Sequence, residues 1–172
     1  ASAKLKGIFG DGFDYEAVRS KRVELMDNYV EKNGIEVKSG AKELLSFLKE
    51  NGYKVALATA TPPERAERYL KAHDLYKYFD VTVSASMVSV GKPAPDIYLK
   101  AAEMLGLSPQ NCVALEDSPN GIKSASSAGC VTVMVPDLDK PSNDIIPLLH
   151  GVADGLSDVK RILRELEDCN IQ

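Results

Sequence analysis

The stretch from Cys112 to Ile122 constrains the fold more than any other part of the sequence. Its apolar start is bounded by turn-forming residues, which predicts a buried strand of a parallel sheet. Two adjacent carboxylates, Glu116 and Asp117, follow this strand, and a Ser-Pro-Asn-Gly turn then leads into a helical run that stops at Gly129. Ligands of open α/β sheets lie at the carboxyl ends of the strands, so we expect both acids at a ligand-binding edge.

A divalent cation would explain why two acids stand side by side at this position. Like charges a few ångströms apart repel each other, and a hard cation such as Mg²⁺ relieves that repulsion through oxygen ligands. The alternative is that Glu116 and Asp117 are only an acid pair at a helix N-terminus, where the helix dipole favours negative charge. The residues alone leave both interpretations open.

The rest of the chain alternates between strand-like and helix-like patterns. Strands are expected over 53–58, 80–84, 112–116 and 131–135, and helices over 62–73, 95–106, the run that stops at Gly129, and 159–166. This alternation predicts βαβ units and therefore an α/β fold with a doubly wound, Rossmann-like parallel sheet. The segment 136–147 is expected to be a loop with a short helix.

The N-terminal part of the chain has a different pattern. Residues 1–13 show no convincing periodicity, whereas Asp14 is placed to cap a helix that runs to about Asn33. One side of that helix carries Val18, Arg22, Leu25, Met26, Tyr29 and Val30. A second amphipathic helix follows, with Leu44, Leu45 and Leu48 directed inward and an end at Asn51-Gly52.

Composition excludes several classes of protein. The 172 residues are 44% apolar and 27% charged with a net charge of −4, which is typical of a soluble domain large enough for a real core. The two signs of charge are interspersed, so no nucleic-acid footprint is expected. No apolar run reaches membrane-spanning length, no signal peptide opens the sequence, and the three cysteines are far apart. We therefore expect a cytoplasmic protein with reduced thiols and neither a nucleic-acid nor a membrane partner.

Two further strand ends carry polar side chains. Thr59 follows an apolar run just before a helix, where a hydroxyl and free backbone N–H groups suit a phosphate, although Thr59 and Thr61 could simply cap that helix. Lys92 stands between Gly91 and Pro93, which restrict the direction of its stem and suit a cation that neutralises phosphate oxygens. The alternative for Lys92 is an ordinary solvated lysine in a loop.

Taken together, these strand ends resemble the haloacid dehalogenase superfamily of phosphotransferases. Thr59, then Gly91-Lys92-Pro93-Ala94-Pro95-Asp96, then Glu116-Asp117-Ser118 with Gly121 and Ile122 follow the order and spacing of its second, third and fourth motifs. The residues of these motifs are most similar to those of the β-phosphoglucomutase-like branch, and the resemblance covers roughly residues 35–155. It implies that Thr59, Ala60 and Lys92 bind phosphate, that Lys92 is catalytic, and that Glu116 and Asp117 hold part of a Mg²⁺ site.

The first motif of that family, Asp-x-Asp-Gly-Thr/Val, has no counterpart in this sequence. In the family its first Asp is the nucleophile and its second is the general acid/base. The superficially similar Leu5–Gly12 stretch fails in either register, because Phe9 replaces the nucleophile in one and Gly12 replaces the acid/base in the other. The nucleophile and the acid/base are therefore expected outside these 172 residues.

The resemblance also divides the chain into two parts. Residues 1–37 are expected to be the C-terminal part of a helical cap, and residues 38–172 a haloacid dehalogenase-like core that lacks its first strand. Arg22 on the cap helix is a candidate substrate contact, with a solvated surface charge as the alternative. The missing central strand is expected to come from a preceding N-terminal segment or from another chain.

The resemblance implies a Mg²⁺-dependent phosphatase. It would hydrolyse a small phosphorylated metabolite through an aspartyl-phosphate intermediate in the intact protein. A sugar-phosphate mutase of the β-phosphoglucomutase type is the alternative within the family, since only the acceptor of the phosphoryl group differs. A non-catalytic fragment that binds phosphate is the alternative outside enzymes. The sequence leaves the substrate open.

Overall fold

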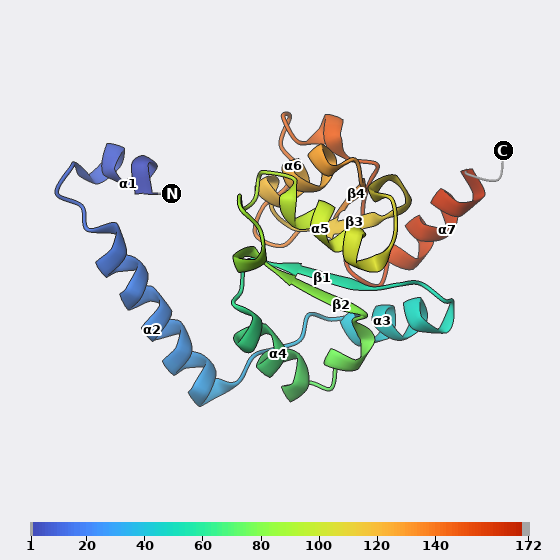
Figure 1. Cartoon of the computed structure of the whole chain (residues 1–172), viewed down its shortest axis with the longest axis horizontal. Helices are drawn as coiled ribbons and strands as arrows, with labels where there is room; N and C mark the ends of the chain where they lie inside the picture. The colour runs from blue at the N-terminus through green and yellow to red at the C-terminus, as the bar shows by residue number, and fades with distance from the viewer. Residues whose placement is uncertain (1, 170–172) are drawn as a thin grey trace. The chain divides into compact units, whose positions relative to one another are not determined.

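The computed structural model describes residues 2–169 and divides into two compact units, Ala1–Glu36 and Val37–Gln172 (Figure 1). The boundary lies one residue from the predicted division at 37/38. That the first unit is part of a helical cap stays a prediction.

The first unit consists of two helices, α1 (Ser2–Phe9) and α2 (Tyr15–Asn33). The predicted cap is confirmed, because Asp14 accepts a hydrogen bond from the Ala17 backbone N–H at 3.0 Å. Gly34 ends α2 with a φ of 77°, and its N–H donates to the Val30 carbonyl. Helix α1 was not predicted, since the glycine-rich sequence before Asp14 lacks helical periodicity.

Helix α2 buries none of its described residues. The apolar side chains Val18, Leu25, Met26 and Tyr29, which the sequence placed along one side of α2, are 50–62% exposed. The helix therefore exists through its caps and local pairs rather than through burial.

The second unit alternates strands and helices as predicted. Its elements are α3 (Ala41–Glu50), β1 (Ala56–Thr59), α4 (Pro63–Ala72), β2 (Val81–Ser84), α5 (Asp96–Leu105), β3 (Val113–Glu116), α6 (Pro119–Ala128), β4 (Val131–Met134), β5 (Gly151–Val152) and α7 (Val159–Cys169). Single 3-10 turns lie at Tyr76–Tyr78, Ala85–Met87, Pro109–Asn111 and Ile146–Leu148. The α/β fold class is thus confirmed, and the loop over 136–147 leads into the expected short helix.

The first strand begins later than predicted. The sequence pattern placed it at 53–58, whereas β1 spans Ala56–Thr59. The Val55 N–H is bound by a carboxylate oxygen of Asp80 at 2.7 Å instead of by a strand carbonyl. The ladder with β2 therefore starts one residue further on, where Ala56 pairs with Val81.

In the described part of the chain, the five strands form two parallel sheets instead of one. One sheet is β1-β2, and the other has the order β3-β4-β5. Val113 of β3 pairs with Val131 of β4, and Val133 of β4 pairs with Gly151 of β5. Strands β1 and β3 share no ladder, although side chains connect their carboxyl ends.

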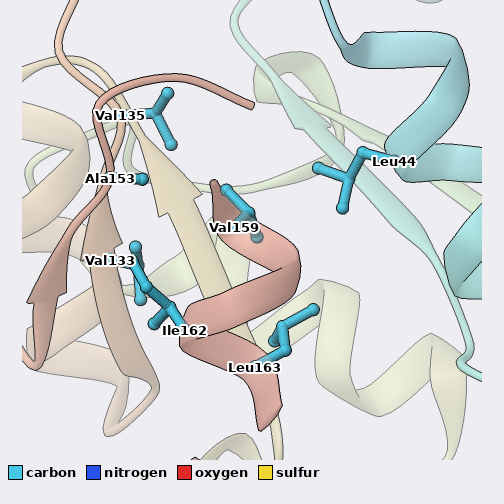
Figure 2. Packing of buried hydrophobic residues seen from close by; sticks show 7 residues of the cluster. All are labelled: Leu44, Val133, Val135, Ala153, Val159, Ile162 and Leu163. Atoms are coloured by element: carbon cyan, nitrogen blue, oxygen red, sulfur yellow. The ribbon is translucent and has the colours of Figure 1, made fainter. Parts of the chain in front are cut away.

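The core lies on both faces of β4, as expected for a doubly wound arrangement. Val133 faces α7, and Figure 2 shows it directed toward Ile162, with Leu163 further along the same helix. Met134 points the other way and packs with Ile122 of α6 and Ile145. Because successive side chains of a strand alternate between faces, one strand anchors both layers of helices.

Helix α5 packs beside both sheets. Its residues Ile97 and Ala101 form a cluster with Val83 of β2, while Tyr98 also touches the cluster of Ala114, Ala125, Ala128 and Cys130 beside β3 and β4. Cys112 and Cys130 have free thiols, of which Cys130 is buried and Cys112 only partly buried, and the side chain of Cys169 lies outside the described residues. No helix in the described range 2–169 combines the length and apolar character needed to cross a membrane.

Candidate phosphate-binding site at the strand ends

Lys92 connects the ends of the two sheets. It lies in the loop between β2 and α5, and its Nζ donates to the Ala58 carbonyl at 3.2 Å and to Oε1 of Glu116. The Lys92 side chain is 21% exposed and the Glu116 side chain only 7%. The ammonium is therefore held at the carboxyl ends of β1 and β3 rather than solvated freely, which argues against an ordinary surface lysine.

The Glu116 carboxylate is buried and contacts side chains from several elements. Its Oε1 accepts hydrogen bonds from Lys92 and from the hydroxyl of Tyr98, and Oε2 lies 3.4 Å from the Ser118 Oγ. A Cβ at Gly121 would lie 1.8 Å from Oε2, so only glycine fits at this point of α6. The carboxylate thus has a fixed position between α5, α6 and the end of β3.

Asp117 has a contrasting environment. It is exposed, and within residues 2–169 its carboxylate has no hydrogen bond or ion pair. The N-cap of α6 is Ser118, whose Oγ accepts from the Gly121 N–H at 3.2 Å. Neither acid therefore caps the helix, and the pair divides into one buried, paired carboxylate and one that faces solvent.

Thr59 and Ala60 lie at the end of β1, beside the carbonyl that Lys92 binds. The Thr59 Oγ1 accepts a hydrogen bond from the Thr61 N–H at 3.0 Å. The Thr61 carbonyl in turn accepts a hydrogen bond from the Ser84 hydroxyl. Helix α4 begins after Pro62 without a side-chain cap. The capping alternative for Thr59 and Thr61 is therefore not realised, and the phosphate role of Thr59 and Ala60 stays a prediction.

The two carboxylates fit part of a magnesium site. Mg²⁺ is often held in enzymes by one or two carboxylates, together with substrate phosphate and water. Asp117 offers unengaged oxygens and Glu116 offers the less engaged Oε2. No group of three or more Asp, Glu, His or Cys side chains in the described chain is arranged for a metal, so further ligands would have to come from elsewhere.

The structure adds information on two individual residues, Arg22 and Tyr98. Arg22 lies exposed on α2 in the first unit, and its role as a substrate contact stays a prediction. Tyr98 was missed, because an aromatic residue on an amphipathic helix is usually core. Burial, and then the Glu116 charge, raise the pKa of Tyr98 well above its usual range, so its hydroxyl remains a donor.

Several proteins that are similar to this chain in sequence are phosphatases. It is 40% identical over 124 residues to a phosphorylated carbohydrates phosphatase of Thermotoga maritima, covering 72% of this chain and 50% of that protein. It is 40% identical over 97 residues to hexitol phosphatase B of Escherichia coli, covering 56% of this chain and 44% of the relative. The chain thus spans about half the length of the curated relatives it matches.

A solved structure and a family model agree with these relatives. A putative beta-phosphoglucomutase from Thermotoga maritima superimposes with a TM-score of 0.75 at 32% identity, over 90% of this chain and 72% of that one. The model of the haloacid dehalogenase-like hydrolases matches residues 7–129, which include Thr59, Lys92, Glu116 and Asp117. With the same residues gathered at the strand ends, this chain belongs to the haloacid dehalogenase-like hydrolase family.

Proposed function

We propose that this chain is part of a magnesium-dependent phosphatase that acts on a small phosphorylated carbohydrate. The observation that carries the proposal is the position of the Lys92 ammonium, between the end of β1 and the buried Glu116 carboxylate. An ammonium has three N–H donors, and two of them are used by Ala58 and Glu116 within the described residues. The third is available to a phosphate oxygen. The cytoplasmic location expected from the sequence stays a prediction.

Each site residue has a defined task in this proposal. Lys92 donates to a phosphate oxygen and balances negative charge that grows in the transition state. The Thr59 hydroxyl and the Ala60 backbone N–H bind the other phosphate oxygens at the end of β1. Asp117 and Glu116 would hold Mg²⁺, which supplies positive charge to the phosphate when it is bound.

The covalent step uses a carboxylate that the family resemblance places outside residues 1–172. A carboxylate oxygen forms a bond to phosphorus while the ester P–O bond breaks, and the sugar alkoxide leaves with a proton from the general acid. Water then attacks the aspartyl phosphate and gives a proton to the same acid/base group, which releases inorganic phosphate and restores both the nucleophilic carboxylate and the protonated general acid. In this proposal the chain contributes the charged side chains of Lys92, Glu116 and Asp117 to the site, and the nucleophile comes from outside residues 1–172.

The proposal includes an extended segment between β1 and β3. These strands belong to separate sheets, and residues 2–9 form helix α1 instead of a strand. A buried backbone group without a partner costs about 1–3 kcal/mol, and a strand edge carries several. Preceding residues, or a segment of another chain, would satisfy these groups and bring the catalytic aspartates to the site.

Near-UV circular dichroism and thermal unfolding test the added strand. Residues 1–172 alone should give weak near-UV signals and a broad transition, because no strand among residues 2–169 pairs with both β1 and β3. The same chain with the completing segment should unfold cooperatively. A soluble monomer of residues 1–172 with a sharp transition would contradict this part of the proposal.

A sugar-phosphate mutase is the second candidate. The structure from Thermotoga maritima that is 32% identical to this chain is described as a putative beta-phosphoglucomutase, which favours this alternative. Inorganic phosphate release distinguishes the two reactions, since a mutase returns the phosphoryl group to a sugar hydroxyl. A non-catalytic phosphate-binding fragment would show phosphate affinity with neither reaction.

Turnover of para-nitrophenyl phosphate with MgCl₂ tests the phosphatase. In the protein that includes the completing segment, Lys92→Ala should lower kcat about 100-fold with a smaller effect on KM, because its charge acts in the transition state. Lys100→Ala is the matched control, since Lys100 is a lysine of α5 whose ion pair with Glu103 lies on the surface.

The isolated chain gives a second outcome. Residues 1–172 alone should show no turnover, because the proposed nucleophile is absent. Turnover by this chain that survives Asp11→Asn but is lost with Asp117→Asn would mean that the nucleophile has been misplaced.

A further inference from the structure

One tyrosine contacts both members of the ion pair at the strand ends. The hydroxyl of Tyr98 donates to Oε1 of Glu116, and the centre of its ring lies 5.0 Å from the Lys92 Nζ. A cation at this distance from a tyrosine ring is attracted by the electrons of its face. Tyr98 therefore restrains the carboxylate through its hydroxyl and the ammonium through its ring.

Tyr98 is itself held firmly. It follows Ile97 in the first turn of α5, where the ring packs against both the cluster around Val83 and the cluster around Ala114. The ring is thus held by packing on both sides, which fixes the position of its hydroxyl beside Glu116.

The position of Lys92 depends on how Glu116 is shared. Oε1 accepts from both Lys92 and Tyr98, so the hydroxyl is a second restraint on the oxygen atom that binds the ammonium. Without this hydroxyl Oε1 would lose one of its two donors, and the remaining restraints, at Gly121 and Ser118, act on Oε2 rather than on Oε1. The ammonium would then lose its fixed direction, and with it the direction of its remaining N–H.

We propose that Tyr98 is a positioning residue that orients the Lys92 ammonium through Glu116, so that one N–H is directed toward the phosphate of a substrate. The claim about orientation rests on the contacts of Tyr98, while the claim about the phosphate rests on the proposed function. Tyr98 does not touch the substrate in this scheme. Its effect reaches the reaction only through Lys92 and Glu116.

Tyr98→Phe tests the proposal, since it keeps the ring and removes only the hydroxyl. The protein is prepared with the segment that completes the sheet, and kcat and KM are measured with para-nitrophenyl phosphate. The expected result is a fall in kcat of about 10-fold with a change in KM below about 3-fold. The reason is that the Tyr98 hydroxyl, through Glu116, orients the Lys92 ammonium that acts on the transition state. Replacing Tyr98 with para-aminophenylalanine restores a donor at the same position and should recover most of the activity.

Tyr78→Phe is the matched control. Tyr78 also has a lysine over its ring, with the Lys77 Nζ 5.5 Å from the centroid, and its hydroxyl is hydrogen-bonded to Ser46 at 3.0 Å. It contacts neither Lys92 nor Glu116. Tyr78→Phe should therefore lower the melting temperature about as much as Tyr98→Phe while leaving kcat unchanged. Equal losses of kcat in the two variants would overturn the proposal.

A second readout does not depend on catalysis. Acetic anhydride modifies free lysine side chains, and mass spectrometry of the peptide that contains Lys92 gives its rate of acetylation. This rate should rise several-fold in Tyr98→Phe and stay unchanged in Tyr78→Phe. An unchanged rate would overturn the orienting role of Tyr98 even in an active enzyme. A protein with the expected labelling but no phosphatase activity would instead overturn the proposed function.

Discussion

Helices α2 and α6 show two different ways in which this chain makes a helix. Helix α2 has 19 residues and buries none of those described, whereas α6 has 10 residues and buries five. Local interactions define α2: the Asp14 cap and two exposed ion pairs at i,i+3, Glu16–Arg19 and Lys21–Glu24. Helix α6 lies against β4 instead, where Ile122 packs with Met134.

The comparison of α2 with α6 shows that local sequence signals can specify a helix whose side chains are not buried, whereas burial supplies most of the stabilisation of a core helix. A cap contributes about 1 kcal/mol and an exposed pair at this spacing about 0.2–0.5 kcal/mol, so local interactions stabilise α2 only slightly. Burial of a single large apolar side chain contributes about 1.5–3 kcal/mol. We therefore expect substitutions in the two helices to have very different effects.

The largest expected difference is between two apolar truncations. Ile122 is fully buried and Leu25 is 57% exposed. Ile122→Ala should lower the free energy of unfolding by about 2–5 kcal/mol, since it leaves a cavity between α6 and β4. Leu25→Ala should change it by less than about 0.5 kcal/mol. Urea denaturation measures both, and a large loss in Leu25→Ala would show that the apolar side of α2 is covered in solution.

A smaller difference is expected between two glycines of the second unit. The Cβ of Gly121→Ala would overlap the Glu116 carboxylate, so we expect a loss of about 1–3 kcal/mol and displacement of Glu116 from Lys92. Nothing lies within 4 Å of the same position at Gly155, and Gly155→Ala serves as the control. Comparable melting temperatures for the two variants would contradict the tight packing of Glu116 against α6.

The smallest effect concerns the surface contact that fixes α7. The Tyr53 hydroxyl donates to Glu167, and burial, followed by this hydrogen bond, raises the Tyr53 pKa to about 12. The ordinary pKa is about 10, so above that pH the unfolded chain releases a proton that the folded chain retains. The stabilisation is complete below pH 10 and is lost as the pH rises through about 12.

Tyr53→Phe isolates this contribution from the other groups that titrate at high pH. The difference in urea midpoint between the parent and Tyr53→Phe should be constant from pH 7 to about 9 and should shrink between pH 10 and 12. A difference in urea midpoint that does not depend on pH would mean that the contact with α7 does not raise the pKa of Tyr53.

The sequence predicted those features that depend on neighbouring residues along the chain. The alternation of strands and helices, the cap at Asp14 and the strand end at Glu116 all follow from local periodicity and turn chemistry. Lys92 was also recognised, because Gly91 and Pro93 mark it locally. These features are the ones for which a short window of sequence contains the physical cause.

Features that depend on distant residues were missed. Tyr98 is 18 residues from Glu116, and its hydrogen bond exists only because α5 packs beside β3. Strand β5 has two residues, Gly151 and Val152, which is too short for any periodicity. The late start of β1 comes from the carboxylate of Asp80, 25 residues away from Val55. No local pattern records these contacts.

Asp80 has a further consequence for the assembly of the sheet. One of its oxygens accepts from the Val55 N–H at 2.7 Å, and both accept from Lys49 of α3 at 2.8–2.9 Å. A slip of β1 by one residue would break the bond from Val55 and turn the side chains of β1 to the opposite faces. The carboxylate therefore helps to set the register of β1 against β2, which is its strand partner within residues 2–169. Any segment that joins β1 there meets donors and acceptors already in order, which lowers the entropy lost on docking.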